Sequence, residues 1–402
     1  MKKIIVIGCP GSGKSTFSRM LNKVIDIPVY HLDNLFWNAD KTTKEKDVFL
    51  KSLNDTIQKD EWIIDGNFNS TLELRLQACD TVIFLDYPLE VCLDGIEKRR
   101  GKPRSDIPWI EVEEDKEFIE FIKSFNQQIK PQIIDLLNQY SNKNRLIFKN
   151  RNEAHHFLWE LEEKQAFIHG WDFSHINDRY IEQEDLPWSY YDRIKTYLKD
   201  DMKLLDYDTG GGEFLLTLNH PYENTFATEG YKPNVELCKE VLLPLGINFK
   251  ECNDASKLPF DNESFDIMIN QHGDFDAKEI YRVLKKDGIF ITQQVGEDND
   301  RDLVEMVLPN TPKPFPHMNL KEQREKFIKA GFKIIEEGEV YKPIKFYDIG
   351  AFVWFAHIIE WEFNHFSVEK CFDKLLDMQR VIDEKGYIEG TIHRYLIVAR
   401  KG

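Results

Sequence analysis

The chain has few features of secreted or membrane proteins. Its six cysteines include no C-x-x-C pair, so the sequence indicates neither a disulfide framework nor a zinc site and is typical of reduced thiols in a cytosol. The apolar run at 351–359 is about half the length that spans a bilayer. The first apolar run is short and leads into a glycine loop, which predicts a strand and not a signal peptide. We therefore expect a cytoplasmic protein with no membrane partner.

Positive charge is also scarce. Lys and Arg number 53 against 70 Asp and Glu, which gives a net charge of −17. Residues 1–162 carry a net charge of −3, and residues 163–402 carry −14. A field of this sign repels polyanions unless a local basic groove overrides it. We therefore expect small-molecule substrates and no nucleic-acid partner, and the sequence leaves the oligomeric state open.

The pattern of apolar runs indicates two domains. Runs typical of strands at 3–7, 62–64, 81–85 and 145–148 alternate with helical stretches, and a second series of runs begins at Leu204. A length of 402 residues also exceeds what one core usually organises. The sequence predicts an α/β protein with two domains, residues 1–162 and 163–402, each built on a mostly parallel sheet.

The glycine-rich segment GCPGSGKS at 8–15 matches G-x-x-x-x-G-K-[ST] in full. Its glycines let backbone N–H groups turn toward phosphate oxygens at a helix N-terminus. Lys14 then reaches the β- and γ-phosphates, and the Ser15 hydroxyl ligates Mg²⁺. The motif predicts binding of ATP and Mg²⁺ by the following residues: Gly8, Gly11, Ser12, Gly13, Lys14, Ser15 and Thr16.

Three acids and a basic cluster follow the motif. Asp33 comes after a short apolar stretch, where small kinases hold the phosphoryl acceptor. Asp65 ends the strand-like WIID and is the expected Mg²⁺-organising acid, with Asp86 as the alternative. A basic cluster then indicates either a lid over the transferred phosphate or a solvated loop. The cluster comprises Arg99, Arg100, Lys102 and Arg104, of which Arg99 and Arg104 join Lys14 and Asp33 as catalytic candidates.

The first domain resembles a known family. The run from the P-loop through HLDNLFW, WIIDGNF, ACDTVIFLDYP and RRGKPRSD is similar to the adenylate-kinase-like bacterial proteins known as DNA topology modulation proteins, over about residues 1–162. The resemblance implies a nucleoside- or nucleotide-kinase-type fold with Lys14, Ser15, Asp33, Asp65 and the lid arginines in its site. It leaves the phosphoryl acceptor open. An acidic run at 111–120 departs from the longer arginine-rich lid expected there.

The second domain has acids at three successive strand ends. The segment KLLDYDTGGG at 203–212 is an apolar strand that runs into an acidic, glycine-rich turn, where backbone can approach a cofactor. Glu229 follows TFAT, the position from which an acid hydrogen-bonds ribose hydroxyls. Asp254 can accept from an adenine amino group. His272, after the strand-like DIMIN, is either a general base near the transferred group or a structural histidine.

With SFDIMI at 264–269 and LKKDGIF at 284–290, this order resembles class I S-adenosylmethionine-dependent methyltransferases over about residues 165–402. The resemblance implies a Rossmann-like sheet of seven strands and S-adenosylmethionine as cofactor. It places Asp206, Gly210 and Gly212 around the methionine part, Glu229 on the ribose, and Asp254 and Ala255 at the adenine.

One position departs from that family's pattern. Asp208 stands where the first glycine of the turn is usual. Its carboxylate either repels the carboxylate of the donor or pairs with the donor's sulfonium or amino charge. The late aromatic stretch at 346–366 leaves a similar choice, between the lining of an acceptor pocket and simple core.

The sequence therefore predicts a bifunctional fusion. Its first half is an ATP-binding P-loop kinase-like domain, and its second half is an S-adenosylmethionine-dependent methyltransferase that acts on a small molecule. The alternative is a nucleotide-dependent regulatory or binding protein whose methyl-donor site is weakened by Asp208.

Overall fold

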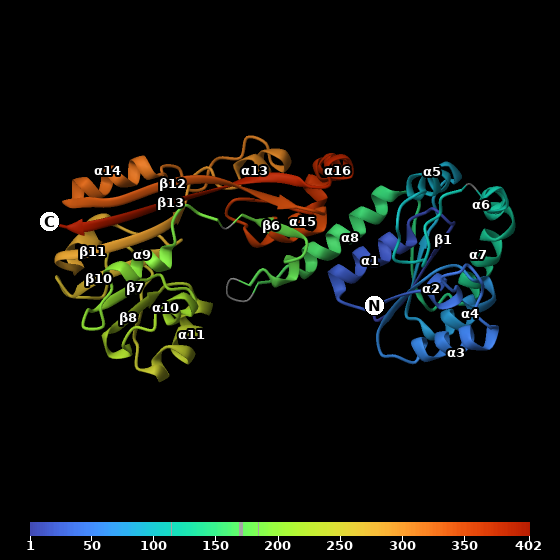
Figure 1. Ribbon diagram of the computed structural model, residues 1–402, viewed down its shortest axis with the longest axis horizontal. Coiled ribbons are helices and arrows are strands. Elements are labelled where there is room, and N and C mark those ends of the chain that lie inside the picture. The colour runs from blue at the N-terminus through green and yellow to red at the C-terminus, as the bar shows by residue number, and fades with distance from the viewer. Residues whose placement is uncertain (114, 169–171, 184) are drawn as a thin grey trace. The chain divides into compact units, whose positions relative to one another are not determined.

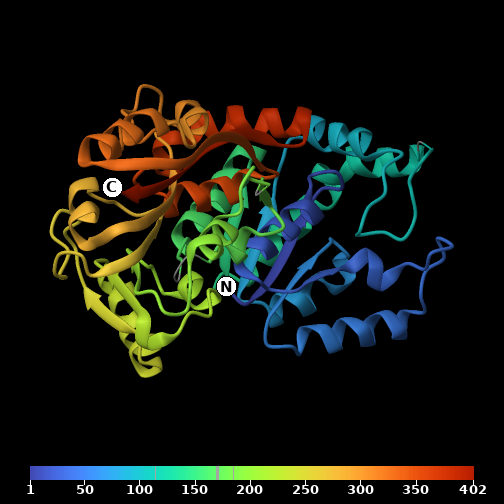
Figure 2. The ribbon, with the colours of Figure 1, turned by 60° about the vertical axis from the view of Figure 1, so that its left-hand side comes forward.

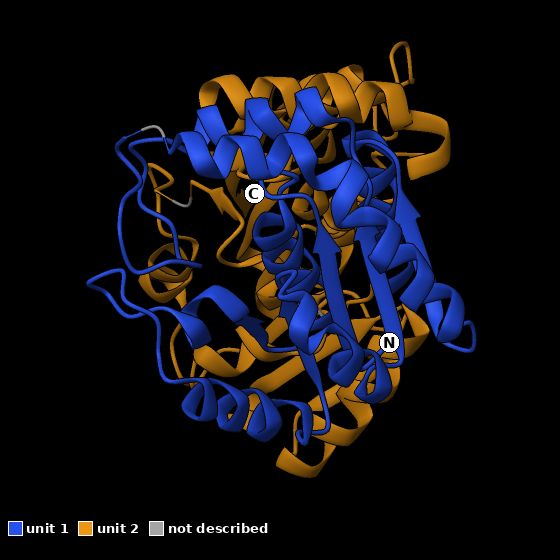
Figure 3. Cartoon of the chain, turned by 90° about the vertical axis from the view of Figure 1, so that its right-hand side faces the viewer, with its two compact units in different colours: residues 1–165 blue, residues 166–402 orange. Residues whose placement is uncertain are grey.

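The structure is a computed structural model that describes residues 1–113, 115–168, 172–183 and 185–402 (Figure 1). The chain forms two compact units, residues 1–165 and 166–402 (Figure 3). The first unit ends with helix α8 (Arg151–Gln165), slightly beyond the expected residue 162. Each unit has its own sheet and its own buried core.

Unit 1 contains a five-stranded parallel sheet in the order β2-β3-β1-β4-β5. Its central strands are wholly buried, as continuous apolar runs in a parallel sheet require. Four of its strands lie where the apolar runs predict them, and the short β2 is additional. The strands are β1 (Lys3–Gly8), β2 (Val29–His31), β3 (Trp62–Asp65), β4 (Thr81–Leu85) and β5 (Asn144–Phe148).

Eight helices surround this sheet among the described residues of unit 1. Helix α1 buries Phe17, Leu21 and Val24, whose spacing puts them on one face. The helices are α1 (Lys14–Ile25), α2 (Leu32–Phe36), α3 (Lys46–Ile57), α4 (Asn69–Ala78), α5 (Leu89–Arg99), α6 (Lys116–Gln128), α7 (Lys130–Gln139) and α8.

Unit 2 contains a mixed sheet in the order β6-β12-β13-β11-β10-β7-β8-β9. Strands β7 to β11 are parallel, whereas β6, β12 and β13 pair antiparallel. The sheet thus has the seven expected strands and a short eighth, β6, on the end of β12. The strands are β6 (Tyr180–Glu182), β7 (Leu204–Tyr207), β8 (Thr225–Glu229), β9 (Asn248–Glu251), β10 (Phe265–Gln271), β11 (Leu284–Val295), β12 (Phe332–Phe346) and β13 (Ile388–Lys401).

The helices of unit 2 include one, α15, that is apolar except for His357. Helix α15 and its flanks bury Phe346, Phe352, Trp354 and Phe355, so the late aromatic stretch forms core. Strands β12 and β13 pair along their whole length and extend beyond the end of β11, where this core lies (Figures 1 and 2). The helices are α9 (Tyr190–Tyr197), α10 (Glu213–Thr217), α11 (Lys232–Val241), α12 (Ala277–Val283), α13 (Arg301–Val307), α14 (Leu320–Ala330), α15 (Ile349–Ile358) and α16 (Val368–Lys385), with 3₁₀ turns at Ser174–Ile176, Tyr222–Asn224 and Leu243–Leu245.

None of the helices in the described ranges combines the length and the apolar character needed to cross a bilayer.

Candidate functional site

The loop between β1 and α1 has the backbone that its glycines allow. Gly11 and Gly13 have φ angles of 83° and 93°, a region that glycine enters without strain. A Cβ atom on Gly11 would come within 2.0 Å of the Cys92 carbonyl oxygen, because α5 packs directly against the loop. No such contact exists at Gly13, which caps α1. The loop is therefore open toward the N-terminus of α1, where a phosphate would lie.

The side chains of Lys14 and Ser15 contact protein groups. The Lys14 ammonium donates to the carbonyl oxygens of Gly8 (2.9 Å) and Cys9 (3.2 Å). Burial lowers the pKa of this ammonium, while the nearby carboxylates of Asp65 and Asp33 oppose the shift. The Ser15 hydroxyl donates to Asp106 Oδ2 at 2.8 Å. Of the remaining loop residues in the prediction, Ser12 is buried with no partner for its hydroxyl, and Thr16 accepts from Arg19.

Three arginines of the basic cluster pair with nearby acids: Arg100 with Glu97, and Arg99 and Arg104 with acids that follow them in the chain. The Arg104 guanidinium grips Asp106 through Nε (3.0 Å to Oδ1) and Nη2 (2.5 Å to Oδ2). It also pairs with Glu111, as does Arg99. Burial alone would raise the pKa of Asp106, but the Arg104 guanidinium and the Ser15 hydroxyl hold it well below its usual range. The segment is thus latched onto the loop through Asp106, a residue that the sequence analysis did not single out.

Two of the three candidate acids approach Lys14. Asp33 lies on α2, where burial and the like charges of Asp106 and Asp65 raise its pKa against the attraction of Lys14. Asp65 ends β3 and its Oδ2 lies 2.8 Å from His31 Nδ1. Asp86, the alternative magnesium-organising acid, is instead paired with Lys130 and Lys149, each at 2.6 Å. These two ammonium groups make Asp86 a poor candidate for a metal ligand.

Two further residues hold the loop in place. The Asn67 side chain accepts from the Gly8 N–H (3.1 Å) and donates to the Gly8 carbonyl oxygen (2.7 Å). Arg75, wholly buried, donates to the carbonyl oxygens of Gly66 (2.9 Å), Asn67 and Phe68 (3.3 Å). The sequence hinted at the contact of Asn67 with Gly8 only through the position of this asparagine, two residues after the strand-ending Asp65. No sequence pattern pointed to the role of Arg75.

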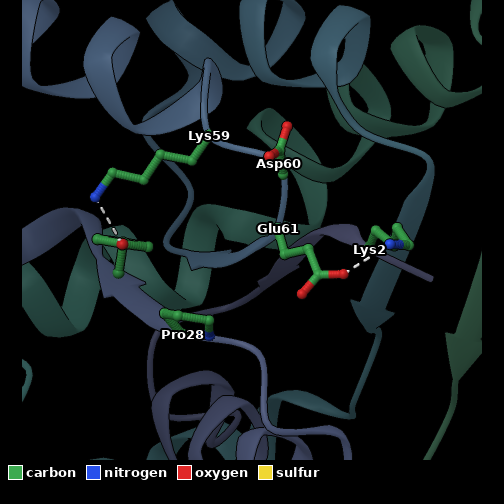
Figure 4. A pocket seen from close by; sticks show the side chains of 6 residues that line it. Lys2, Pro28, Lys59, Asp60 and Glu61 are labelled. Atoms are coloured by element: carbon green, nitrogen blue, oxygen red, sulfur yellow. Dashed lines mark hydrogen bonds and ion pairs between the residues drawn. The ribbon is translucent and has the colours of Figure 1, made fainter.

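A surface pocket of unit 1 lies at the opposite edge of the sheet (Figure 4). Its lining includes Lys2, just before β1, and Asp60 and Glu61, just before β3. The glycine loop follows the carboxyl end of β1, so this pocket is not the phosphate site. Lys2 pairs with Glu61 (2.8 Å), and Lys59 donates to the Tyr30 hydroxyl (2.8 Å). Within the lining, Lys2 and Glu61 thus neutralise each other, and Lys59 is held by a tyrosine.

In unit 2 a second glycine turn follows β7. Asp208, Gly210 and Gly212 all have positive φ angles, of 61°, 65° and 87°. Asp206, on the strand itself, accepts from the Thr209 hydroxyl at 2.6 Å. Burial raises the pKa of Asp206 to about 7, and the charges of Asp208 and Glu229 act in the same direction. The turn therefore has several carboxylates close together.

Glu229, at the end of β8, is tied to this turn. Its Oε2 accepts from the Gly210 N–H, and its Oε1 accepts from the N–H groups of Gly230 and Tyr231, each at 2.8 Å. These donors stabilise an ionised carboxylate. Burial, the charge of Glu229 and a side-chain hydrogen bond with it raise the pKa of Asp208 to about 7. Proximity to Glu229 thus favours the protonated form of Asp208.

The remaining predicted residues follow β9 and β10. Asp254 and Ala255 come after β9, and the exposed Asp254 carboxylate accepts from the Ser256 N–H and hydroxyl. His272 comes after β10 with a φ of 61°. The residue as a whole is exposed, although burial of its imidazole and then the charge of Arg394 lower the pKa of that ring. This shift makes His272 a weaker base than a free imidazole.

The predicted residues of unit 2 share one edge of the sheet. Strands β10, β7, β8 and β9 are parallel neighbours, so Asp206, Glu229, Asp254 and His272 all lie at their carboxyl ends. Asn270, wholly buried near the end of β10, is a further residue of this edge that the sequence did not predict. Its Nδ2 donates to the Tyr207 carbonyl oxygen (2.8 Å), which fixes β7 against β10.

Different parts of the chain are similar to different known proteins. Residues 205–292 match the family of methyltransferase domains, so the chain contains a methyltransferase domain. The N-terminal region is similar to adenylate kinases. It is 29% identical over 122 residues to that of Thermotoga maritima, a match that covers 29% of this chain and 54% of the relative. The adenylate kinase of Thermotoga petrophila is 28% identical over the same length. The chain spans about half the length of these curated relatives, and both resemblances read from the sequence are confirmed.

Solved structures are similar only at a low level. The YcgJ protein of Bacillus subtilis has a TM-score of 0.37 at 23% identity, over 53% of this chain and 97% of that protein. A SAM-dependent methyltransferase of Methanosarcina mazei has a TM-score of 0.33 at 18% identity, over 52% and 96%. Similarity this low does not bear on activity.

Proposed function

We propose that the protein is a two-site enzyme in which unit 1 transfers phosphoryl groups and unit 2 methylates a small molecule. The observation that carries the proposal is the convergence, in each unit, of a glycine turn and strand-ending acids at the carboxyl edge of the sheet. When bound, Mg²⁺ and ATP would supply an activated phosphoryl group, and S-adenosylmethionine would supply an electrophilic methyl group.

The residues of unit 2 fit an adenosyl donor. Glu229 uses three acceptor positions on backbone N–H groups, and a carboxylate offers about four. Room thus remains for a ribose hydroxyl. Asp206, Gly210 and Gly212 would contact the amino-acid end of the donor, and Asp254 with Ala255 would contact the adenine. His272 would position the acceptor or take its proton, with the limit that its lowered pKa sets.

The residues of unit 1 fit a magnesium nucleotide. Lys14 reaches backbone carbonyl oxygens at the mouth of the loop, from which it can turn to a phosphate. Ser15 would ligate Mg²⁺ and Asp65 would orient its waters. Asp33, with its raised pKa, is suited to accept a proton from an acceptor hydroxyl. Arg99 and Arg104 would contact transferred phosphate only after release from Glu111 and Asp106.

One observation favours the alternative, a nucleotide-dependent binding protein with a weakened donor site. Asp208 places a carboxyl group in the turn where the donor would lie, beside Glu229. If that group excludes the donor, ATP would bind and S-adenosylmethionine would not.

Calorimetric titration of the full chain separates the two functions. We expect Mg²⁺ with ATP and S-adenosylmethionine each to bind at one site, and neither to abolish the binding of the other. Binding of ATP alone would favour the regulatory alternative. Binding of neither ligand would contradict both.

A further inference from the structure

In the part of the chain that the structure describes, the turn after β7 is surrounded by acids that are not paired with cations. The charged groups that act on Asp206, Asp208 and Cys238 are all carboxylates. In the ranges that the structure describes, none of these carboxylates forms an ion pair with a lysine, arginine or histidine. They come from four segments of unit 2, namely Asp206 and Asp208 at β7, Glu213 on α10, Glu229 on β8 and Asp274 after β10.

The backbone N–H groups of the turn are largely engaged as well. The Thr209 N–H donates to Thr228 (2.9 Å), that of Gly210 to Glu229 (2.8 Å) and that of Gly212 to Thr209 (3.2 Å). The Glu213 carboxylate lies against Gly211, where a Cβ atom would come within 2.3 Å of its Oε1. A ligand carboxylate needs N–H donors or a cation. Among the described residues, this turn has few N–H donors left for a ligand carboxylate and no cation to pair with it.

Asp208 occupies the crevice where a ligand of this fold lies. A Cβ atom on Gly273 would come within 2.3 Å of Asp208 Oδ2 and 2.7 Å of its Cβ, so the side chain reaches from the turn after β7 to the turn after β10. Between these neighbouring strands the order of the sheet reverses, since β8 lies on one side of β7 and β10 on the other. Open α/β sheets bind ligands at such a switch point.

We propose that this site selects adenosyl sulfonium ligands by charge, and that Asp208 makes a donor with a carboxylate-free, amine-bearing arm a tighter ligand than S-adenosylmethionine. The inference rests on the proposed methyl-donor site and names the ligand class that it prefers. Like charges at close range repel, and a sulfonium and an ammonium are attracted to the same carboxylates. Both ligands carry the same S-methyl group, so the preference concerns binding and leaves the transferred group unchanged.

The protonation of Asp208 gives the preference a pH dependence. The titratable groups that interact with Asp208 are the carboxyls of Asp206, Glu229 and Asp274, the Tyr207 hydroxyl and the Cys252 thiol, and none of these groups is a cation. A dicationic ligand favours the ionised form of Asp208, so its affinity should rise as pH increases through about 7. A ligand carboxylate favours the protonated form, so its repulsion should grow over the same interval. The ratio of the two affinities should therefore increase from pH 6 to pH 8.

The test is isothermal titration calorimetry of the full chain with three ligands: S-adenosylmethionine, its decarboxylated aminopropyl analogue and S-adenosylhomocysteine. We expect the decarboxylated ligand to bind at least tenfold more tightly than S-adenosylmethionine at pH 8, with a smaller ratio at pH 6. In Asp208→Asn and Asp208→Gly the ratio should fall toward one. Both replacements tolerate a positive φ, so the turn should keep its conformation.

Asp201→Asn is the matched control, because it makes the same charge change at an exposed position before β7. It also corrects for the α-amino group of S-adenosylmethionine, which begins to titrate in this interval, whereas the aminopropyl amine stays protonated. Equal or tighter binding of S-adenosylmethionine, or an unchanged ratio in Asp208→Asn, would overturn the inference and leave the donor site intact. If none of the three ligands binds while ATP does, the proposed methyl-donor site itself is wrong.

Discussion

The two glycine turns of this protein have similar backbones and different surroundings. Each connects a buried strand near the middle of its sheet to a helix. Around the loop after β1, acids and cations lie next to each other. Lys14 lies near Asp33 and Asp65, and Arg104 forms an ion pair with Asp106. Around the turn after β7, only acids are found among the described residues. A glycine turn thus indicates that a ligand approaches the backbone, and the surrounding charge indicates what kind of ligand it is.

The largest expected effect is at Lys14. Lys14 is the charged residue in the first turn of α1 that contacts the loop. Lys14→Ala removes this charge, so the rate of phosphoryl transfer should fall by about 10²–10³ or more. Binding of S-adenosylmethionine should be unchanged, because the two sites lie on separate cores. The measurement is phosphoryl transfer from labelled ATP beside calorimetry with the methyl donor. Lys51→Ala, an exposed lysine on α3, is the control. Equal loss of both functions in a folded variant would refute two independent sites.

The next largest effect is at Glu229. Glu229→Ala removes the acceptor for ribose hydroxyls and leaves three backbone N–H groups without their partner. Donor affinity should fall by about 1–3 kcal/mol, or roughly 5- to 150-fold. Titration of S-adenosylhomocysteine measures this without catalysis. Glu240→Ala, an exposed acid on α11, should bind as the parent does. Parent-like affinity in Glu229→Ala would show that the ribose lies elsewhere.

The two glycine turns and several of the acids around them could be predicted from the local sequence. The P-loop is a continuous eight-residue motif, and β4 lies at the predicted residues because an apolar run between turns specifies a buried strand. The order of Asp206, Glu229 and Asp254 along the chain was enough to predict a shared edge, because parallel strands end together. These features depend on neighbours in sequence.

Other features depend on residues far away in the chain. Asp65 and Asp86 both end apolar strands and look alike in sequence. Lys130 and Lys149, many residues later, are what exclude Asp86. The long β12 was not predicted, because charged residues interrupt its apolar positions and it is held by its pairing with β13. The clamp of Asn67 on Gly8 likewise exists only in the folded chain.

The comparison also predicts different pH responses of the two units. Burial raises the pKa of Asp206, Asp208 and Glu362 to about 7 and also raises that of Asp300, all in unit 2. Asp33 is the one carboxyl of unit 1, among its described residues, that shifts upward. A carboxyl with a raised folded-state pKa binds protons more tightly in the folded state. Stability therefore falls as pH rises from the unfolded value near 4 to the folded one.

Thermal proteolysis of the full chain, with peptides assigned to each unit by mass spectrometry, measures this difference. Between pH 5 and pH 8 the unfolding midpoint of unit 2 should fall by roughly 3–8 °C, and that of unit 1 should fall less. Asp206→Asn should flatten the response of unit 2, since this buried group no longer titrates. A parallel fall in both units would contradict the assignment of the acidic interior to unit 2.

The smallest expected effect concerns the latch of unit 1. Asp106 accepts from the Ser15 hydroxyl at 2.8 Å, the group that would otherwise ligate Mg²⁺, and it holds Arg104 in a two-point ion pair. Asp106→Asn removes the charge while it keeps the size of the side chain. Because one hydrogen bond contributes about 0.5–1.5 kcal/mol, the affinity for magnesium ATP should rise roughly 2- to 10-fold as Ser15 and Arg104 become available. Asp94→Asn, an exposed acid on α5, is the control. A tenfold or greater loss of affinity in Asp106→Asn would mean that this carboxylate belongs to the metal site. Acids would then be as important for ligand binding at the loop after β1 as at the turn after β7.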